Sequence, residues 1–242
     1  MARIKKATGI KKNSEQDEID FQRTTENKIK IQDIIIACED KVSAPTYFKM
    51  IVSRLIQNKA ITQDSFVIAT PHNTHPTGVL ADLINHQCEH GKTYQDFEHK
   101  WIVIDRDKER VSGGGHTKEN FNNAIKEAKR LEVDIAYAID SFEIWYLLHF
   151  DYRDSAISRD DILGIIIKKL KAINSSKFNE LNKKNIKNEE NTKLIFVELL
   201  GLQEIAIKNA EKLLKSTPEY NDPSTTVHKL VQILNEFKNT ND

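Results

Sequence analysis

Acidic residues follow three short apolar stretches of the chain, each at the point where the stretch ends. The pairs are Glu39 and Asp40, Asp105 and Asp107, and Asp140 and Glu143. Mg²⁺ and Mn²⁺ prefer oxygen ligands of this kind, and such an ion can polarise a phosphoryl oxygen and prepare a water molecule for attack. These residues therefore predict a divalent-metal site for phosphate chemistry, provided that the fold brings the three chain positions together.

The apolar stretches have the length of buried strands, and amphipathic stretches alternate with them. We expect strands at 31–38, 65–70, 101–104 and 135–139, and helices at 43–58, 79–87, 121–131 and 142–150. Repeated alternation predicts an α/β fold with a mostly parallel sheet flanked by helices. In such a sheet the functional crevice lies outside the carboxyl ends of the strands, which is where the acidic residues fall.

We expect the chain to have three parts. Residues 1–27 are polar and show no hydrophobic period, which indicates a flexible N-terminal arm. The α/β core spans 28–155, and 156–242 form a helical C-terminal region packed on or beside it. In that region we expect helices at 162–173, 193–214 and 227–237. Ser43 and Ser224 are the predicted N-caps of the helices that follow them.

The composition limits the classes of protein to consider. Lysine plus arginine and aspartate plus glutamate both number 36, so any contact with nucleic acid must come from local patches of positive charge. No apolar run is long enough to span a membrane, and the polar N-terminus lacks the apolar region of a signal peptide. We therefore expect a cytoplasmic protein without membrane contact. The two cysteines, Cys38 and Cys88, are too few for a disulfide framework or a four-thiolate zinc site.

Each acidic residue also has an ordinary structural interpretation. Acidic residues after strands are common in loops, where they have no chemical role. The spacing Asp140-x-x-Glu143 fits a variant capping box, which would stabilise the start of a helix. Only the convergence of several strand ends favours a functional site over these alternatives.

Several basic residues could contact a phosphate-bearing substrate. Arg106 lies between the paired aspartates, His116 follows three glycines, and Lys168 and Lys169 belong to a lysine-rich run of the helical region. The run could contact a phosphate backbone, or it could be a solvated helix face. The glycine-rich loop with His116 could contact substrate, or it could be a plain surface loop.

The histidines elsewhere have two interpretations. His72 and His75 follow the second strand, where they are either metal ligands or polar loop residues. His149 lies among leucines and aromatic residues, and we expect a buried core histidine there. The aromatic residues at helical spacing around it could stack nucleic-acid bases, but the pattern favours core packing.

Five stretches carry a resemblance to a known family: IIIACED (34–40), PTYF (45–48), VIDRD (103–107), IDSFEIWYLLHF (139–150) and NDPSTTVHKLVQIL (221–234). From about residue 30 to the C-terminus, the chain resembles the RloB family of bacterial abortive-infection and phage-defence proteins. That family is related to the Toprim-fold enzymes, which include topoisomerases, primases and the OLD-type nucleases. The resemblance therefore implies a Toprim-like, Rossmann-like core.

The resemblance also implies roles for the acidic residues. In the Toprim fold a glutamate follows the first strand and an Asp-x-Asp pair follows the third, and together they handle divalent metal and phosphodiester chemistry. By motif position Glu39 matches that glutamate, and Asp105 and Asp107 match the pair. Glu143 matches the acidic residue of the family's F-E-x-W-x-L-x-H-F helix, where it would be a further ligand or a general base.

The chain departs from the family at two positions. The family usually has glycine after the first-strand glutamate, where this chain has Asp40. A carboxylate there would either join the metal ligands or repel substrate phosphate. The family's glutamate before Pro-x-Tyr-Phe is replaced by Ala44, so the site would lack one ligand if that glutamate binds metal in relatives.

The resulting hypothesis is a nuclease dependent on Mg²⁺ or Mn²⁺ that acts in anti-phage defence. RNA, in particular tRNA, is favoured over DNA because related Toprim effectors are associated with that target. The resemblance also implies an AAA-type ATPase partner, and a homo-oligomer is left open. The rival is a catalytically weak Toprim-like subunit that binds the ATPase or nucleic acid. A third alternative is a receiver-like or phosphohydrolase domain with Asp105 as phosphoryl acceptor.

Overall fold

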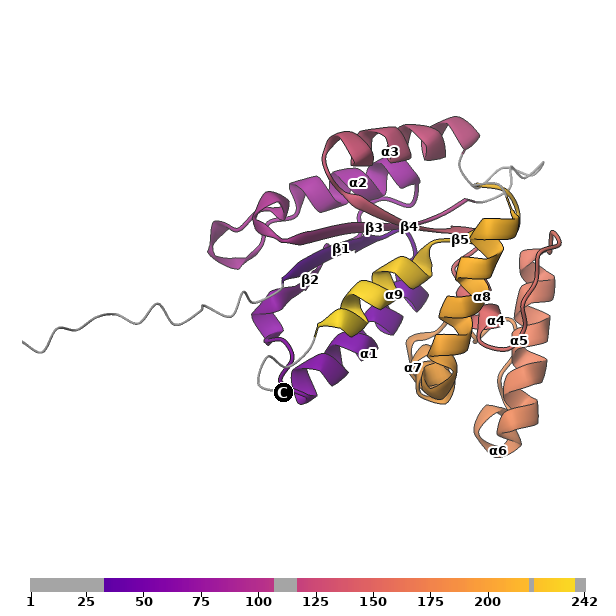
Figure 1. Ribbon diagram of the computed structural model, residues 1–242. Coiled ribbons are helices and arrows are strands. Elements are labelled where there is room, and N and C mark those ends of the chain that lie inside the picture. The colour runs from indigo at the N-terminus through magenta and orange to yellow at the C-terminus, as the bar shows by residue number, and fades with distance from the viewer. Residues whose placement is uncertain (1–32, 107–116, 218–219, 238–242) are drawn as a thin grey trace, which may run out of the picture. The chain divides into compact units, whose positions relative to one another are not determined.

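A five-stranded sheet forms the centre of the computed structural model, which describes residues 33–106, 117–217 and 220–237 (Figure 1). Its strands lie in the order β2-β1-β3-β4-β5. They are β1 (Ile34–Cys38), β2 (Phe66–Ile68), β3 (His99–Asp105), β4 (Asp134–Ile139) and β5 (Ser224–Thr225). The first four pair in parallel, and β5 pairs antiparallel with β4. The predicted α/β fold with a mostly parallel sheet is thereby confirmed.

Helices cover both faces of this sheet, and further helices pack on them. The helices of the described residues are α1 (Ser43–Gln57), α2 (Pro76–Asn85), α3 (Lys118–Arg130), α4 (Ile144–Leu148), α5 (Arg159–Ile173), α6 (Ser175–Phe178), α7 (Glu189–Leu199), α8 (Gln203–Ser216) and α9 (Val227–Glu236). Short 3₁₀ turns lie at Gln63–Ser65, Glu89–Gly91, Tyr94–Asp96 and Leu200–Leu202. Helices α2 and α3 lie on one side of the sheet, and α1, α4, α8 and α9 lie on the other (Figure 1).

The alternation of side chains along β1 explains how one strand serves two cores. Ile34, Ile36 and Cys38 pack into the cluster formed with α1 and the C-terminal helices. Ile35 and Ala37 point the other way, into the cluster formed with α2 and α3. All five side chains are buried, as expected for a central parallel strand covered on both faces. The run of apolar residues therefore fixes the position of the residue that follows it, Glu39.

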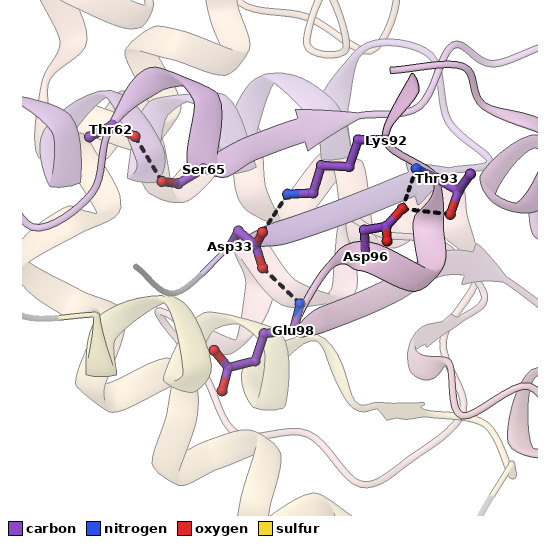
Figure 2. Close-up of polar contacts among 7 residues, drawn as sticks. All are labelled: Asp33, Thr62, Ser65, Lys92, Thr93, Asp96 and Glu98. Carbon is purple, nitrogen blue, oxygen red and sulfur yellow. Dashed lines mark hydrogen bonds and ion pairs between the residues drawn. The ribbon is translucent and has the colours of Figure 1, made fainter. Parts of the chain in front are cut away.

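Polar residues just before β1 and β3 make contacts at the amino-terminal ends of these strands (Figure 2). The Asp33 carboxylate accepts a 2.7 Å hydrogen bond from the backbone N–H of Glu98 and forms an ion pair with Lys92. Thr93 and Asp96 form a capping box around the turn between them. Asp33 thereby ties the start of β1 to the start of β3, where Ile34 pairs with His99, and β3 runs two residues beyond the end of β1, to Asp105.

The start of α1 differs from the sequence prediction. Ser43 is the first helical residue and its hydroxyl makes no capping hydrogen bond, so the prediction of Ser43 as N-cap is wrong. The Asp40 carboxylate does the capping instead. Its Oδ1 accepts from the N–H of Val42 at 3.1 Å, and its Oδ2 accepts from the N–H of Ala44 at 3.0 Å. A carboxylate here satisfies free N–H groups and also interacts favourably with the helix dipole.

Two further predictions in the C-terminal region are wrong. The helix expected at 193–214 is divided by the 3₁₀ turn Leu200–Leu202, which contains Gly201 and separates α7 from α8. Ser224, predicted as an N-cap, belongs to strand β5, and its hydroxyl pairs with that of Tyr137 at 3.0 Å. The second departure comes from a tertiary contact, because a two-residue strand forms only where β4 offers it a partner.

Candidate functional site

The carboxyl ends of β1 and β3 are joined by two hydrogen bonds. The N–H of Glu39 donates to the carbonyl oxygen of Val103 at 2.9 Å and continues the strand pairing. The N–H of Asp105 donates to Oε2 of Glu39 at 3.1 Å, so the glutamate side chain turns toward the end of β3. The structure thus brings together two of the acidic positions that the sequence singled out, as parallel neighbouring strands require.

Asp105 is a buried acid at the end of β3, with 8% of the residue exposed. Burial raises its pKa well above the usual value, and the negative charges of Glu143 and then Glu39 raise it further. The positive charges of Lys187 and Arg159 oppose this effect only in part. The carboxylates of Glu143 and Glu39 are therefore close enough to Asp105 to disfavour its charged form.

Glu143 reaches this group from the turn after β4. Its carboxylate is buried, with the Nζ of Lys187 3.1 Å from Oε1 and an Nη of Arg159 3.9 Å from Oε2. Neither oxygen accepts a hydrogen bond of good geometry from the described residues. Glu143 precedes α4 without capping it, so the capping-box alternative is wrong. The two cations from the helical region are what balances this buried charge.

The described residues do not complete a metal centre by themselves. Within residues 33–106, 117–217 and 220–237, no three His, Cys, Asp or Glu side chains form a group that could hold an ion. Asp107, expected as a ligand, and His116, expected as a substrate contact, lie outside these residues. The donor chemistry of Glu39 and Asp105 still fits a hard cation, because both side chains offer carboxylate oxygens at the ends of neighbouring strands.

The chain matches the family model described as RloB-like protein over residues 34–234. It belongs to the RloB-like family. The match runs from β1 into α9, so it includes every strand end and helix considered above, and it confirms the resemblance seen in the sequence. No curated protein and no solved structure matches this chain.

Asp40 and Ala44, the two positions at which the resemblance implies a departure from the family's motif, are linked in space. Both carboxylate oxygens of Asp40 accept hydrogen bonds from the first turn of α1 in this RloB-like chain. One of the two N–H groups that it caps belongs to Ala44, whose side chain is fully buried. In the described structure Asp40 has a structural task, and a ligand role for it stays a prediction.

Sequence reasoning missed the cations nearest to the carboxylates of this RloB-like chain. Lys187 was only one member of the lysine-rich run, and Arg159 opens α5 directly after the N-cap Ser158. Lys169 pairs with Asp151 at 2.9 Å, and its expected contact with substrate stays a prediction. Nothing in the spacing of these lysines distinguishes Lys187, because its selection depends on a contact with the distant Glu143.

Arg106 and Lys168 have different surroundings from those of the carboxylates. An Nη of Arg106 donates to the carbonyl oxygen of Tyr220, and the guanidinium lies 6.0 Å from the centre of the Phe121 ring. Arg106 therefore ties the end of β3 to the segment before β5. Lys168 lines a surface hollow with Arg153 and residues of α5. A role for either residue in substrate binding stays a prediction.

The histidines take structural positions. Nδ1 of His75 accepts from the N–H of Gly78 at 3.1 Å and caps α2. The backbone N–H of His72 donates to Oδ2 of Asp82 at 2.9 Å, which fixes the loop before α2. His149 is buried, as expected, and its Nδ1 lies 2.8 Å from the carbonyl oxygen of Trp145. Burial lowers the pKa of His149 to about 4, so its ring is neutral at pH 7.

The aromatic residues near His149 belong to the core. Phe142, Trp145 and Tyr146 are buried, and their rings pack around Tyr47. They are therefore unavailable for stacking on bases.

Among the described residues, no helix is both long and apolar enough to cross a membrane.

Proposed function

We propose that this chain is a divalent-metal-dependent nuclease with a Toprim-like core, and that it acts in bacterial anti-phage defence. The observation that carries the proposal is the meeting of Glu39 and Asp105 at the carboxyl ends of adjacent parallel strands, where a 3.1 Å hydrogen bond joins them and the charge of Glu143 also acts on Asp105. Placing like charges together in a buried setting is costly, and it is common where a site binds a cation. The strand order and membership of the RloB-like family support the same interpretation.

Glu39, Asp105 and Asp107 would hold the Mg²⁺ or Mn²⁺. Such an ion supplies charge to the phosphoryl oxygens and lowers the pKa of water. The hydrogen bond between Glu39 and the N–H of Asp105 keeps the glutamate oriented toward the end of β3. Fixing a ligand in this way reduces the entropy lost when the ion and substrate bind.

Arg159 and Lys187 would bind the substrate phosphate beside the ligands. Both side chains are partly exposed, at 28% and 30%, while the Glu143 carboxylate that they contact is only 1% exposed. The buried glutamate can therefore orient the two cations while their outer surfaces face a substrate. On this reasoning Glu143 acts mainly by positioning, and its roles as further ligand or general base are secondary.

We favour RNA, including tRNA, as substrate and an AAA-type ATPase as partner, both by analogy with related Toprim effectors. One candidate besides the nuclease has support in the structure. A catalytically weak subunit that binds the ATPase or nucleic acid is favoured by Ala44, which offers no ligand, and by the ion pairs that already balance Glu143. The capping role of Asp40 points the same way.

Cleavage assays separate the two candidates. The purified chain is incubated with tRNA, single-stranded RNA and plasmid DNA, with EDTA, Mg²⁺ or Mn²⁺, and with and without an AAA-type ATPase of the kind expected as its partner. We expect metal-dependent cleavage that is lost in Glu39→Gln and in Asp105→Asn. Asp64→Asn, an exposed carboxylate before β2, is the matched control and should leave cleavage unchanged. Absence of cleavage with the ATPase and a phage trigger present would leave the binding subunit as the better account.

A further inference from the structure

Helices α1 and α7 pack side by side (Figure 1). Residues of both helices line a hollow of about 410 Å³. Its lining includes the ammonium-bearing side chains of Lys41, Lys49 and Lys193, all of which are exposed. Glu189 supplies the carboxylate among the lining residues. Positive charge therefore exceeds negative charge in this hollow, although the chain as a whole is neutral.

The hollow adjoins the carboxylate site along two stretches of chain. Lys41 stands two residues after Glu39, and two residues span at most about 7 Å. On the other wall, Asn188 lines the hollow and directly follows Lys187, whose ammonium group contacts Glu143. The hollow and the carboxylates are therefore connected by short stretches of chain on two sides.

Lys49 lies close to the start of α7 as well as on α1. The pKa of Glu189 is lowered first by its hydrogen bond with Lys193 and also by the positive charge of Lys49. The lysines from the two helices therefore act on the same part of the hollow.

We propose that this hollow binds a backbone phosphate of a nucleic-acid strand, next to the phosphate held at the carboxylate site. The inference rests on the proposed nuclease function and extends it by naming Lys41, Lys49 and Lys193 as substrate-positioning residues. Ammonium groups on flexible stems suit phosphate recognition as point charges. The described lining holds no aromatic ring on which a base could stack, so the hollow contacts the backbone and is indifferent to sequence.

The ion pair between Glu189 and Lys193, with 2.6 Å between Oε1 and Nζ, competes with this binding. Both side chains are more than half exposed, so water screens the pair and a phosphate can displace the glutamate. Removing the glutamate charge should therefore strengthen binding. This gives a variant whose effect is a gain, which a folding defect would not produce.

The test measures binding of a fluorescein-labelled single-stranded RNA by anisotropy in EDTA, where no cleavage occurs, over a series of salt concentrations. The variants are Lys41→Ala, Lys49→Ala and Lys193→Ala, singly and combined, with Glu189→Gln. The matched control combines Lys118→Ala, Lys126→Ala and Lys129→Ala, exposed lysines of α3 on the other side of the sheet. Circular dichroism and thermal unfolding verify that each variant is folded.

Each lysine that contacts a phosphate contributes about 0.7 to the slope of log K against log salt for a single strand. We expect the combined variant to lose affinity and part of this slope, Glu189→Gln to bind more tightly, and the α3 control to match the wild type. Unchanged affinity and slope in the combined variant would overturn the inference while leaving the nuclease proposal intact. Loss of binding in that variant, in a protein that never cleaves, would uphold the phosphate site and reject the nuclease.

Discussion

The backbone N–H of Asp105 donates a 3.1 Å hydrogen bond to Oε2 of Glu39, and the two residues lie at the ends of neighbouring parallel strands. This bond uses one oxygen of the glutamate and leaves its charge beside the buried Asp105 carboxyl group, whose pKa it helps to raise. The arrangement separates two contributions that substitutions can test independently: the hydrogen bond, which is structural, and the charge, which a metal site needs.

Glu39→Gln keeps an oxygen that can accept from Asp105 but removes the charge. We expect unfolding free energy close to that of the wild type and a loss of metal-dependent cleavage of at least about 100-fold, since changes to outer-shell partners alone cost 10- to 100-fold. Glu39→Ala should lose both cleavage and about 1 kcal/mol of stability with the hydrogen bond. Equal cleavage by wild type and Glu39→Gln would contradict the ligand role.

Asp105→Asn should stabilise the metal-free protein at neutral pH. The folded-state pKa of Asp105 lies above its ordinary value of 3.8, so its contribution to stability is present below that value and is lost as pH rises through the folded-state pKa. The asparagine variant lacks this loss, and chemical unfolding at several pH values should show a flatter profile. Added Mg²⁺ should raise the unfolding temperature of the wild type more than that of the variant.

Lys187→Ala should destabilise the protein because it leaves the buried Glu143 carboxylate with a weaker counter-charge. Breaking a buried ion pair costs about 3–5 kcal/mol, and the partial exposure of Lys187 and the remaining Arg159 reduce our expectation to about 1–3 kcal/mol. The double variant with Glu143→Gln should be less destabilised than the sum of the single variants. Additive effects in urea unfolding would show that the two residues do not interact.

Substitutions of Asp40 can distinguish a role in capping α1 from a role in catalysis. Asp40→Ala should cost about 0.5–2 kcal/mol, because the N–H groups of Val42 and Ala44 lose their acceptor. Asp40→Asn keeps a good capping group, so its stability should stay near that of the wild type. If Asp40 only caps α1, Asp40→Asn should also cleave normally. A large loss of cleavage in this stable variant would assign Asp40 to the metal ligands.

Protonation of the buried His149 should destabilise the folded protein in mild acid. Its folded-state pKa, about 4, lies below its ordinary value of 6.5, so the stability it provides is lost as pH falls from about 6.5 toward 4. The difference corresponds to about 3 kcal/mol at most. His149→Asn, whose amide can still donate to Trp145, should show a weaker pH dependence in this window. His228, with a pKa also near 4, should supply the slope that remains.

The local pattern of the sequence determined most of the elements. The apolar run ending at Cys38 folds as the expected strand, and the amphipathic run at 121–131 folds as part of the expected helix, because burial of one face or both is encoded in the local pattern. The family could also be recognised from short motifs. The order of strands and helices places the acidic residues at the ends of strands. The hydrogen bond between Glu39 and Asp105 agrees with this expectation.

Tertiary structure decided what local pattern could not. Strand β5 exists only because β4 offers it a partner, and Asp40 replaces Ser43 as the cap because the turn after β1 carries its carboxylate over the helix start. Lys187 was one lysine among many until the fold placed it against Glu143, which lies on a distant part of the chain. Charge compensation of a buried group depends on contacts between such distant segments, and no periodicity records them.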